Sequence, residues 1–161
     1  MTAKVAIIMG SRSDLEAMEE ARQVLTKFGI ETETRALSAH RTPGAVEEFI
    51  SGLADRGFAA VIAGAGGAAH LAGVCASHTH LPVFGVPMRT TLAGGLDSLL
   101  STVQMPRGIP VATTATGGTG AYNAALLAVS VIGLSDPEIQ EKYKAFRAEQ
   151  TANVLAQSVI D

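Results

Sequence analysis

The chain has 161 residues, the length of a single domain. It carries 12 basic and 15 acidic residues, a net charge of -3 and no basic block, which argues against nucleic acid or an anionic membrane as a partner. Charged residues make up only 17% of the chain, against a typical ~25%, so we expect copies of the chain to cover one another in a homo-oligomer.

Short apolar runs rich in β-formers alternate with segments that are long enough for crossover helices, which predicts an α/β fold with a parallel sheet. The near-continuous apolar character of residues 5–9 and 60–63 predicts strands covered on both faces. We therefore expect a flavodoxin-like three-layer sandwich with five strands and an extra C-terminal helix, as one domain over residues 1–161. The five predicted strands are residues 5–9, 31–37, 59–63, 83–86 and 109–113.

Helix-start signals follow the first two strands. Ser13 and Glu16 have capping-box spacing, which predicts that Ser13 caps the first helix. Thr42 is expected to cap the second helix, with Pro43 at its first position and its end near residue 55.

The most apolar stretch, residues 58–76, contains clustered glycines and a histidine, so it predicts a buried strand followed by a buried helix, and argues against a membrane span. The only cysteine, Cys75, cannot pair within the chain, and no secretory signal opens it, so we expect a buried thiol and a cytoplasmic location. Residues 120–134 predict a buried helix, and Asp136 with Pro137 begins an amphipathic C-terminal helix.

Three loops at predicted strand ends hold the unusual residues, and ligands of open α/β sheets bind at that edge. The first loop offers Ser11, Ser13 and a helix N-terminus, which suit a phosphate, although both serines could simply cap the helix. The Asp14 carboxylate could stabilise the positive end of the helix dipole, or it could accept hydrogen bonds from sugar hydroxyls.

The second loop places His40 beside Arg41. Arginine supplies a forked donor set for phosphate, and histidine can give and take a proton near neutral pH. A single histidine is more often structural, and with the predicted phosphate site nearby an acid/base role and a structural role for His40 both stay open.

The third loop contains Gly64, Gly66 and Ala69 in G-x-G-x-x-A spacing, which could suggest a dinucleotide site. The motif is not on the first strand, and the next strand does not end in an acidic residue, so NAD is disfavoured. The glycines instead offer backbone N–H groups for a carboxylate or a phosphate.

Other chemistries find less support. His70, His78 and His80 could suggest a metal, but no thiolate pair or carboxylate set completes the site, so a surface turn is the preferred interpretation for the last two. No nucleophile-elbow or Walker motif is present. Residues 96–101, 104–108 and 117–120 could form a lid or a subunit contact, or simply turns and packing surfaces.

Taken together, five ordered motifs resemble the class I PurE family, the N5-carboxyaminoimidazole ribonucleotide mutases of purine biosynthesis. The match spans almost the whole chain, and the second and third motifs point to the mutase rather than to the related carboxylase that uses free carbon dioxide. The motifs are MGSRSD (9–14), SAHRTP (38–43), AGAGGAAHLAG (63–73), GLDSLLSTVQMPRGIPVAT (95–113) and GAYNAALLA (120–128).

The resemblance implies a flavodoxin-like subunit, an octamer, a nucleotide substrate and no metal, nucleotide or organic cofactor. It implies that His40 moves the proton as the carboxyl group migrates from nitrogen to carbon. Ala72, residues 88–92 and Gly118-Thr119 depart from the family pattern, so no roles are carried over to them. Phosphate and ribose contacts map onto Ser11, Ser13, Asp14 and Arg41, and the carboxylate side of the site onto Ser38, Ala65, Gly66, Gly67, Ala68, His70 and Leu71.

On this mechanism, released carbon dioxide is held in a dry pocket lined by the N–H groups of Gly66, Gly67 and Ala68. Two alternatives remain open. One is an aminoimidazole ribonucleotide carboxylase that takes free carbon dioxide, and the other is a non-catalytic module that binds a phosphosugar or a flavin.

Overall fold

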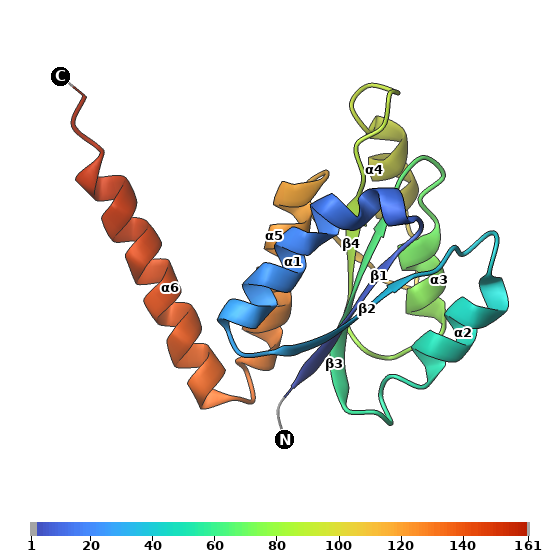
Figure 1. Cartoon of the computed structure of the whole chain (residues 1–161), viewed down its shortest axis with the longest axis horizontal. Coiled ribbons are helices and arrows are strands. Elements are labelled where there is room, and N and C mark those ends of the chain that lie inside the picture. Colours follow the sequence, from blue (N-terminus) through green and yellow to red (C-terminus); the bar gives the residue numbers. More distant parts are fainter. Residues whose placement is uncertain (1–2, 161) are drawn as a thin grey trace.

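A computed structural model describes residues 3–160 and confirms the predicted α/β class (Figure 1). Twelve elements follow one another along the described residues. They are β1 (Lys4–Met9), a 3-10 helix η1 (Arg12–Asp14), α1 (Leu15–Lys27), β2 (Glu31–Ala36), α2 (Pro43–Ser51), β3 (Phe58–Ala65), α3 (Leu71–Ser77), β4 (Val83–Pro87), α4 (Leu96–Val103), β5 (Ala112–Thr113), α5 (Gly118–Ile132) and α6 (Pro137–Ala156).

The five strands form one parallel sheet in the order β2-β1-β3-β4-β5, which is the expected flavodoxin-like order. Because every strand runs the same way, the loops that follow them meet along one edge of the sheet. The chain connections run in opposite directions on the two sides of the β1–β3 pair. In open α/β sheets, ligands bind in the crevice at the carboxyl ends of such a strand pair.

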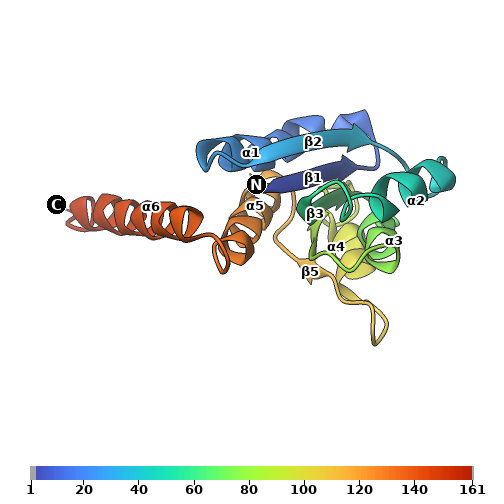
Figure 2. The same ribbon diagram turned by 90° about the horizontal axis from the view of Figure 1, so that it is seen from below.

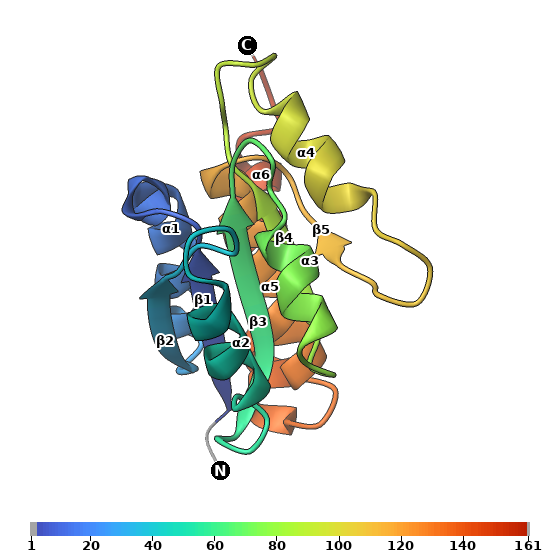
Figure 3. The ribbon, with the colours of Figure 1, turned by 90° about the vertical axis from the view of Figure 1, so that its right-hand side faces the viewer.

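Helices cover both faces of the sheet, as Figure 3 shows, with α1 and α5 on one side and α2, α3 and α4 on the other. Alternate residues of β1 supply the two cores: Val5 and Ile7 pack toward α1 and α5, whereas Ala6 and Ile8 pack toward α2 and α3. This double burial explains why the central strands are apolar without alternation.

Helix α6 leaves the body of the domain and extends outward from its junction with α5 (Figure 2). Asp136 caps it, since its Oδ1 accepts the N–H groups of Glu138 and Ile139. Within α6 only Ile139 and Phe146 are buried, so the amphipathic character that we expected holds for the first half alone. Every residue of its second half, 147–156, is exposed.

Several local predictions need correction. Ser11, and not Ser13, provides the cap: its Oγ accepts the N–H of Ser13 and begins η1, and α1 starts only after Asp14. The Thr42 hydroxyl bonds to the backbone of Ser38 and caps no helical N–H. These hydroxyls find partners in their own loops, and such local bonds compete with capping.

Other boundaries also differ. Helix α2 ends at Ser51, four residues before the predicted end, β5 spans only Ala112–Thr113, and α5 begins at Gly118. The stretch 58–76 is the expected strand followed by a helix. Among residues 3–160, no helix combines the length and the apolar character needed to cross a bilayer.

Candidate functional site

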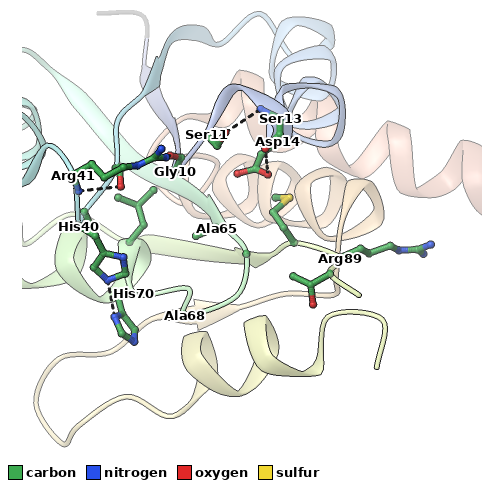
Figure 4. Close-up of a pocket in the computed structure, with 16 residues that line it drawn as sticks. Gly10, Ser11, Ser13, Asp14, His40, Arg41, Ala65, Ala68, His70 and Arg89 are labelled. Carbon is green, nitrogen blue, oxygen red and sulfur yellow. Dashed lines mark hydrogen bonds between the residues drawn. The ribbon is translucent and has the colours of Figure 1, made fainter. Parts of the chain in front are cut away.

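A cleft of about 510 Å³ lies at the carboxyl ends of the strands (Figure 4). The loops after β1, β2, β3 and β4 all contribute to its walls. Of the predicted site residues, all but Gly67 line it. Those that line it are Ser11, Ser13, Asp14, Ser38, His40, Arg41, Ala65, Gly66, Ala68, His70 and Leu71.

The loop after β1 forms one end of the cleft. The Ser11 side chain is already used as a cap, while the Ser13 Oγ donates to Asp14 Oδ1 at 3.3 Å. Asp14 is half-buried, and this burial raises the pKa of its carboxyl above 3.8, although the hydrogen bonds from Ser13 and from the backbone of Ser11 oppose the shift. A carboxylate held in this way is partly desolvated and available to ligand hydroxyls.

The loop after β2 is a compact turn closed on itself. The Ser38 Oγ accepts the N–H of Arg41 at 3.2 Å, and the Ser38 carbonyl accepts the N–H of Thr42 at 2.8 Å. The Arg41 Nη2 donates to the carbonyl of Gly10 at 3.3 Å, so its guanidinium reaches across to the first loop. Figure 4 shows Arg41 beside Gly10, on the same side of the cleft as Ser11. A positive charge and two serines therefore border the same space.

His40 faces His70 from the neighbouring loop. Its Nε2 lies 2.9 Å from the Nδ1 of His70, and the two rings are nearly perpendicular at 89°. Both rings are exposed in the isolated chain. One imidazole donates and the other accepts, so the tautomers of the two rings are linked. The single chain does not by itself enclose this end of the cleft.

Glycines shape both the end of β3 and the loop that follows it. A Cβ added to Gly64 would meet the thioether ends of Met18 and Met88 at 2.5 and 2.7 Å. Gly67 adopts a left-handed conformation with φ of 69°, and its N–H donates to Ser98 Oγ at 2.9 Å. The expectation that this N–H lines the pocket is therefore not supported, because it already has a partner outside the cleft.

No role was predicted for Met88, Arg89 and Thr90, yet all three line the cleft. They follow β4 directly, so the rule that placed the other loops at the ligand edge would also have found them. Figure 4 shows Arg89 directed away from the histidine pair. Its side chain also borders an adjoining hollow of about 380 Å³, beside Gly117 and α1.

The remaining candidates lie elsewhere. His78 follows α3 and is half-buried, and His80 is exposed beyond it, as the surface-turn interpretation predicts. In the described part of the chain, no three His, Cys, Asp or Glu side chains gather in a way that could hold a metal ion. Cys75 is fully buried, as expected, and this burial raises the pKa of its thiol to about 12.

Comparison with known proteins gives a consistent result. The family model described as AIR carboxylase matches residues 4–153. The chain is 51% identical to a Pseudomonas aeruginosa protein and 54% identical to one from Vibrio vulnificus, both named N5-carboxyaminoimidazole ribonucleotide mutase. These matches cover 96% and 95% of this chain, and 95% of each relative. A crystal structure titled Treponema denticola PurE matches with a TM-score of 0.86 and 30% identity, over 96% of this chain and 95% of that one.

Proposed function

The chain belongs to the AIR carboxylase family, and on this premise we propose that it converts N5-carboxyaminoimidazole ribonucleotide to 4-carboxy-5-aminoimidazole ribonucleotide in purine biosynthesis. It is thus a mutase, an isomerase that moves one carboxyl group, and residues 1–161 form its single catalytic domain. The observation that carries the proposal is the cleft itself, which gathers His40, Arg41 and Asp14 from two loops into one space. The carboxyl shift needs a proton carrier, a phosphate anchor and a sugar contact, and these three residues supply them.

The phosphate of the nucleotide sits between Arg41 and the first loop. Arg41 already reaches the carbonyl of Gly10, and its guanidinium has further donors with which to fork onto a phosphate. The hydroxyls of Ser11 and Ser13 lie on the same side. The Asp14 carboxylate accepts hydrogen bonds from the ribose hydroxyls. The heterocyclic ring of the nucleotide then extends toward the histidine pair.

His40 acts first as an acid and then as a base. It gives a proton to the exocyclic nitrogen as the bond from that nitrogen to the carboxyl carbon breaks, and the bonding pair stays on nitrogen. Carbon dioxide is released, and the adjacent ring carbon attacks it to form the new carbon–carbon bond. The ring carbon then returns its proton to His40, so the cycle closes with no net change in protons or electrons.

The loop after β3 holds the carbon dioxide between the two steps. In the part of the chain that the structure describes, no protein acceptor pairs with the N–H of Gly66 or of Ala68. Both residues line the cleft, so these two donors are free to bind a carboxylate or carbon dioxide oxygen. Ser38, Ala65, His70 and Leu71 complete that side of the site.

The same proposal includes a homo-oligomer, an octamer by resemblance, in the cytoplasm. Large apolar side chains are exposed on the outer part of the chain, with Leu134 82% and Val154 71% exposed. Val154 and Leu155 are neighbours near the exposed end of α6, and exposed apolar side chains there support a contact between copies of the chain. A neighbouring copy would also cover the exposed histidine pair and exclude water from the reaction. Light scattering or native mass spectrometry of the purified chain tests the assembly.

The decisive assay incubates the purified chain with the carbamate nucleotide in the absence of ATP, added metal and bicarbonate. Formation of the carbon-carboxylated nucleotide at a rate above the enzyme-free control supports the mutase. A product that forms only from aminoimidazole ribonucleotide with added bicarbonate would identify the carboxylase instead. Tight nucleotide binding with no product in either assay would favour a non-catalytic binding module.

A further inference from the structure

We propose that Ser98 and Asp97, at the start of α4, are positioning residues that hold the loop of residues 66–68 in the conformation that retains carbon dioxide. The inference rests on the function proposed above and deepens it. Neither residue lines the cleft, so they act on the reaction only through the residues that they hold.

Both backbone groups of Gly67 are tied to α4. Its N–H donates to Ser98 Oγ at 2.9 Å, and its carbonyl lies 3.3 Å from Ser101 Oγ, whose hydroxyl is shared with the Asp97 carbonyl at 2.8 Å. The two neighbours of Gly67 differ, because the N–H groups of Gly66 and Ala68 have no protein acceptor among the described residues. The central N–H is thus bound to the helix while the flanking pair is left for the ligand.

Ser98 is suited to this role because it is completely buried. It has 0% exposure and is one of only two buried polar residues of the described chain, the other being Thr102 on the same helix. A buried hydroxyl needs partners, and Ser98 has them on both sides. It accepts from Gly67 and lies 3.5 Å from the Asp97 Oδ1 as a weak donor.

Asp97 connects the same network to a second wall of the cleft. Its Oδ1 accepts the hydroxyl of Thr90 at 2.6 Å and the N–H of Ser98 at 2.9 Å. Thr90 lines the cleft, and its methyl group lies 3.4 Å from the position of a Cβ on Gly66. The Asp97 carboxylate therefore positions both the first turn of α4 and the Thr90 side chain, which packs against the loop of residues 66–68.

The start of the helix that carries these residues packs closely against the residue that follows β4. Gly95 precedes α4 with φ of 106°, and a Cβ there would lie 2.7 Å from the carbonyl oxygen of Met88. Only glycine permits this approach. Because the start of α4 packs against the end of β4, the hydrogen bond from the Gly67 N–H to Ser98 Oγ positions the loop relative to that wall of the cleft.

The test follows the fate of the carboxyl carbon. Carbamate nucleotide with a ¹³C-labelled carboxyl group is turned over in unlabelled bicarbonate, and each escape of carbon dioxide appears as free aminoimidazole ribonucleotide or as unlabelled product. The escaping fraction is counted per turnover, so it does not depend on how much of a variant is folded. Parallel enzyme-free incubations correct for spontaneous loss.

Ser98→Ala and Asp97→Ala are expected to raise the escaping fraction about tenfold, the factor that one lost buried hydrogen bond provides. Asp97→Asn keeps an oxygen for Thr90 and the N–H of Ser98, and it should restore most of the retention. Thr102→Val is the matched control: it deletes a buried hydroxyl from the same helix, one that bonds to the Ser98 carbonyl and not to the loop.

If the wild-type chain forms no product, the proposed function fails. If the wild type turns over and Ser98→Ala loses no more carbon dioxide than Thr102→Val, the proposed function stands and the positioning role is refuted. Equal leakage from Asp97→Asn and Asp97→Ala would likewise refute the part assigned to the Asp97 oxygen.

Discussion

The Nε2 of His40 lies 2.9 Å from the Nδ1 of His70, although thirty residues separate them in the chain. While this contact is made, the Nε2 of His40 is occupied and its Nδ1 is the nitrogen left to exchange a proton with a ligand. Since a neutral imidazole carries one N–H, His70 also selects which nitrogen of His40 is protonated. The pair is therefore the natural place to test the mechanism.

His40→Asn should lower turnover by at least ~10²-fold, the usual cost of losing a general acid/base, while ligand affinity and the unfolding temperature stay near wild type. The ring is exposed in the chain and contributes little to the core, so its loss should not disturb folding. Steady-state kinetics and thermal unfolding measure both. His80→Asn, on an exposed turn, is the control, and near-normal turnover in the His40 variant would refute its role.

Arg41→Ala should weaken binding of the phosphorylated nucleotide about tenfold or more, because it removes a charge-assisted donor. Binding of the dephosphorylated nucleoside should hardly change. Calorimetric titration with both ligands separates the two effects. The control is Arg56→Ala. Arg56 pairs with Glu33 and lies just before β3, at the end of that strand opposite the cleft, so its loss should affect neither ligand. Equal loss with both ligands would show that Arg41 does not contact the phosphate.

Asp14→Asn should stabilise the free protein at neutral pH while weakening nucleotide binding. Burial raises the pKa of Asp14 above 3.8, so the folded chain holds this proton more tightly than the unfolded chain. The free energy of unfolding therefore falls as pH rises through that raised pKa, and the ionised carboxylate is a cost above it. Because Asp14 is half-exposed, solvent reduces this cost, and we predict only its sign.

Thermal unfolding of Asp14→Asn and wild type across pH checks this. The gain in unfolding temperature should be present at neutral pH and shrink as the pH falls through the raised pKa of Asp14, because the wild-type carboxyl then also becomes neutral. A gain that is constant with pH would contradict the linkage. Unchanged nucleotide affinity would contradict the ribose contact.

Cys75 should react with thiol reagents only when the protein unfolds. It is fully buried in α3, and its thiol has a pKa of about 12, so almost no thiolate forms near neutral pH. Labelling followed by mass spectrometry should be slow in buffer and fast in denaturant. Rapid labelling of the native protein would show that α3 opens locally.

Gly120→Ala should lower the free energy of unfolding by at least about 2 kcal/mol, because a Cβ there would overlap the backbone carbonyl of Ala115. Gly118→Ala is the control on the same helix, where the nearest atom is the movable Cγ of Glu20 at 3.4 Å. Its effect should stay within about 1 kcal/mol, the range of helix propensity. Similar denaturation midpoints for the two variants would contradict the packing argument.

The chemistry-bearing loops were predictable because they follow directly from the strands. Buried parallel strands are apolar without alternation, and their carboxyl ends share one edge, so residues 10–14, 38–43 and 64–70 had to meet there. The parallel class and the strand positions came from the same pattern. Burial of Cys75 was likewise readable from an apolar stretch.

The tertiary structure alone decided which groups touch. Nothing local pairs His40 with His70 or directs the Gly67 N–H to Ser98, since these contacts join segments thirty or more positions apart in the chain. The outward direction of α6 is likewise a feature of the tertiary structure. Sequence periodicity records which side of an element is buried, but the distance between two loops depends on how helices and strands pack, which no single segment encodes.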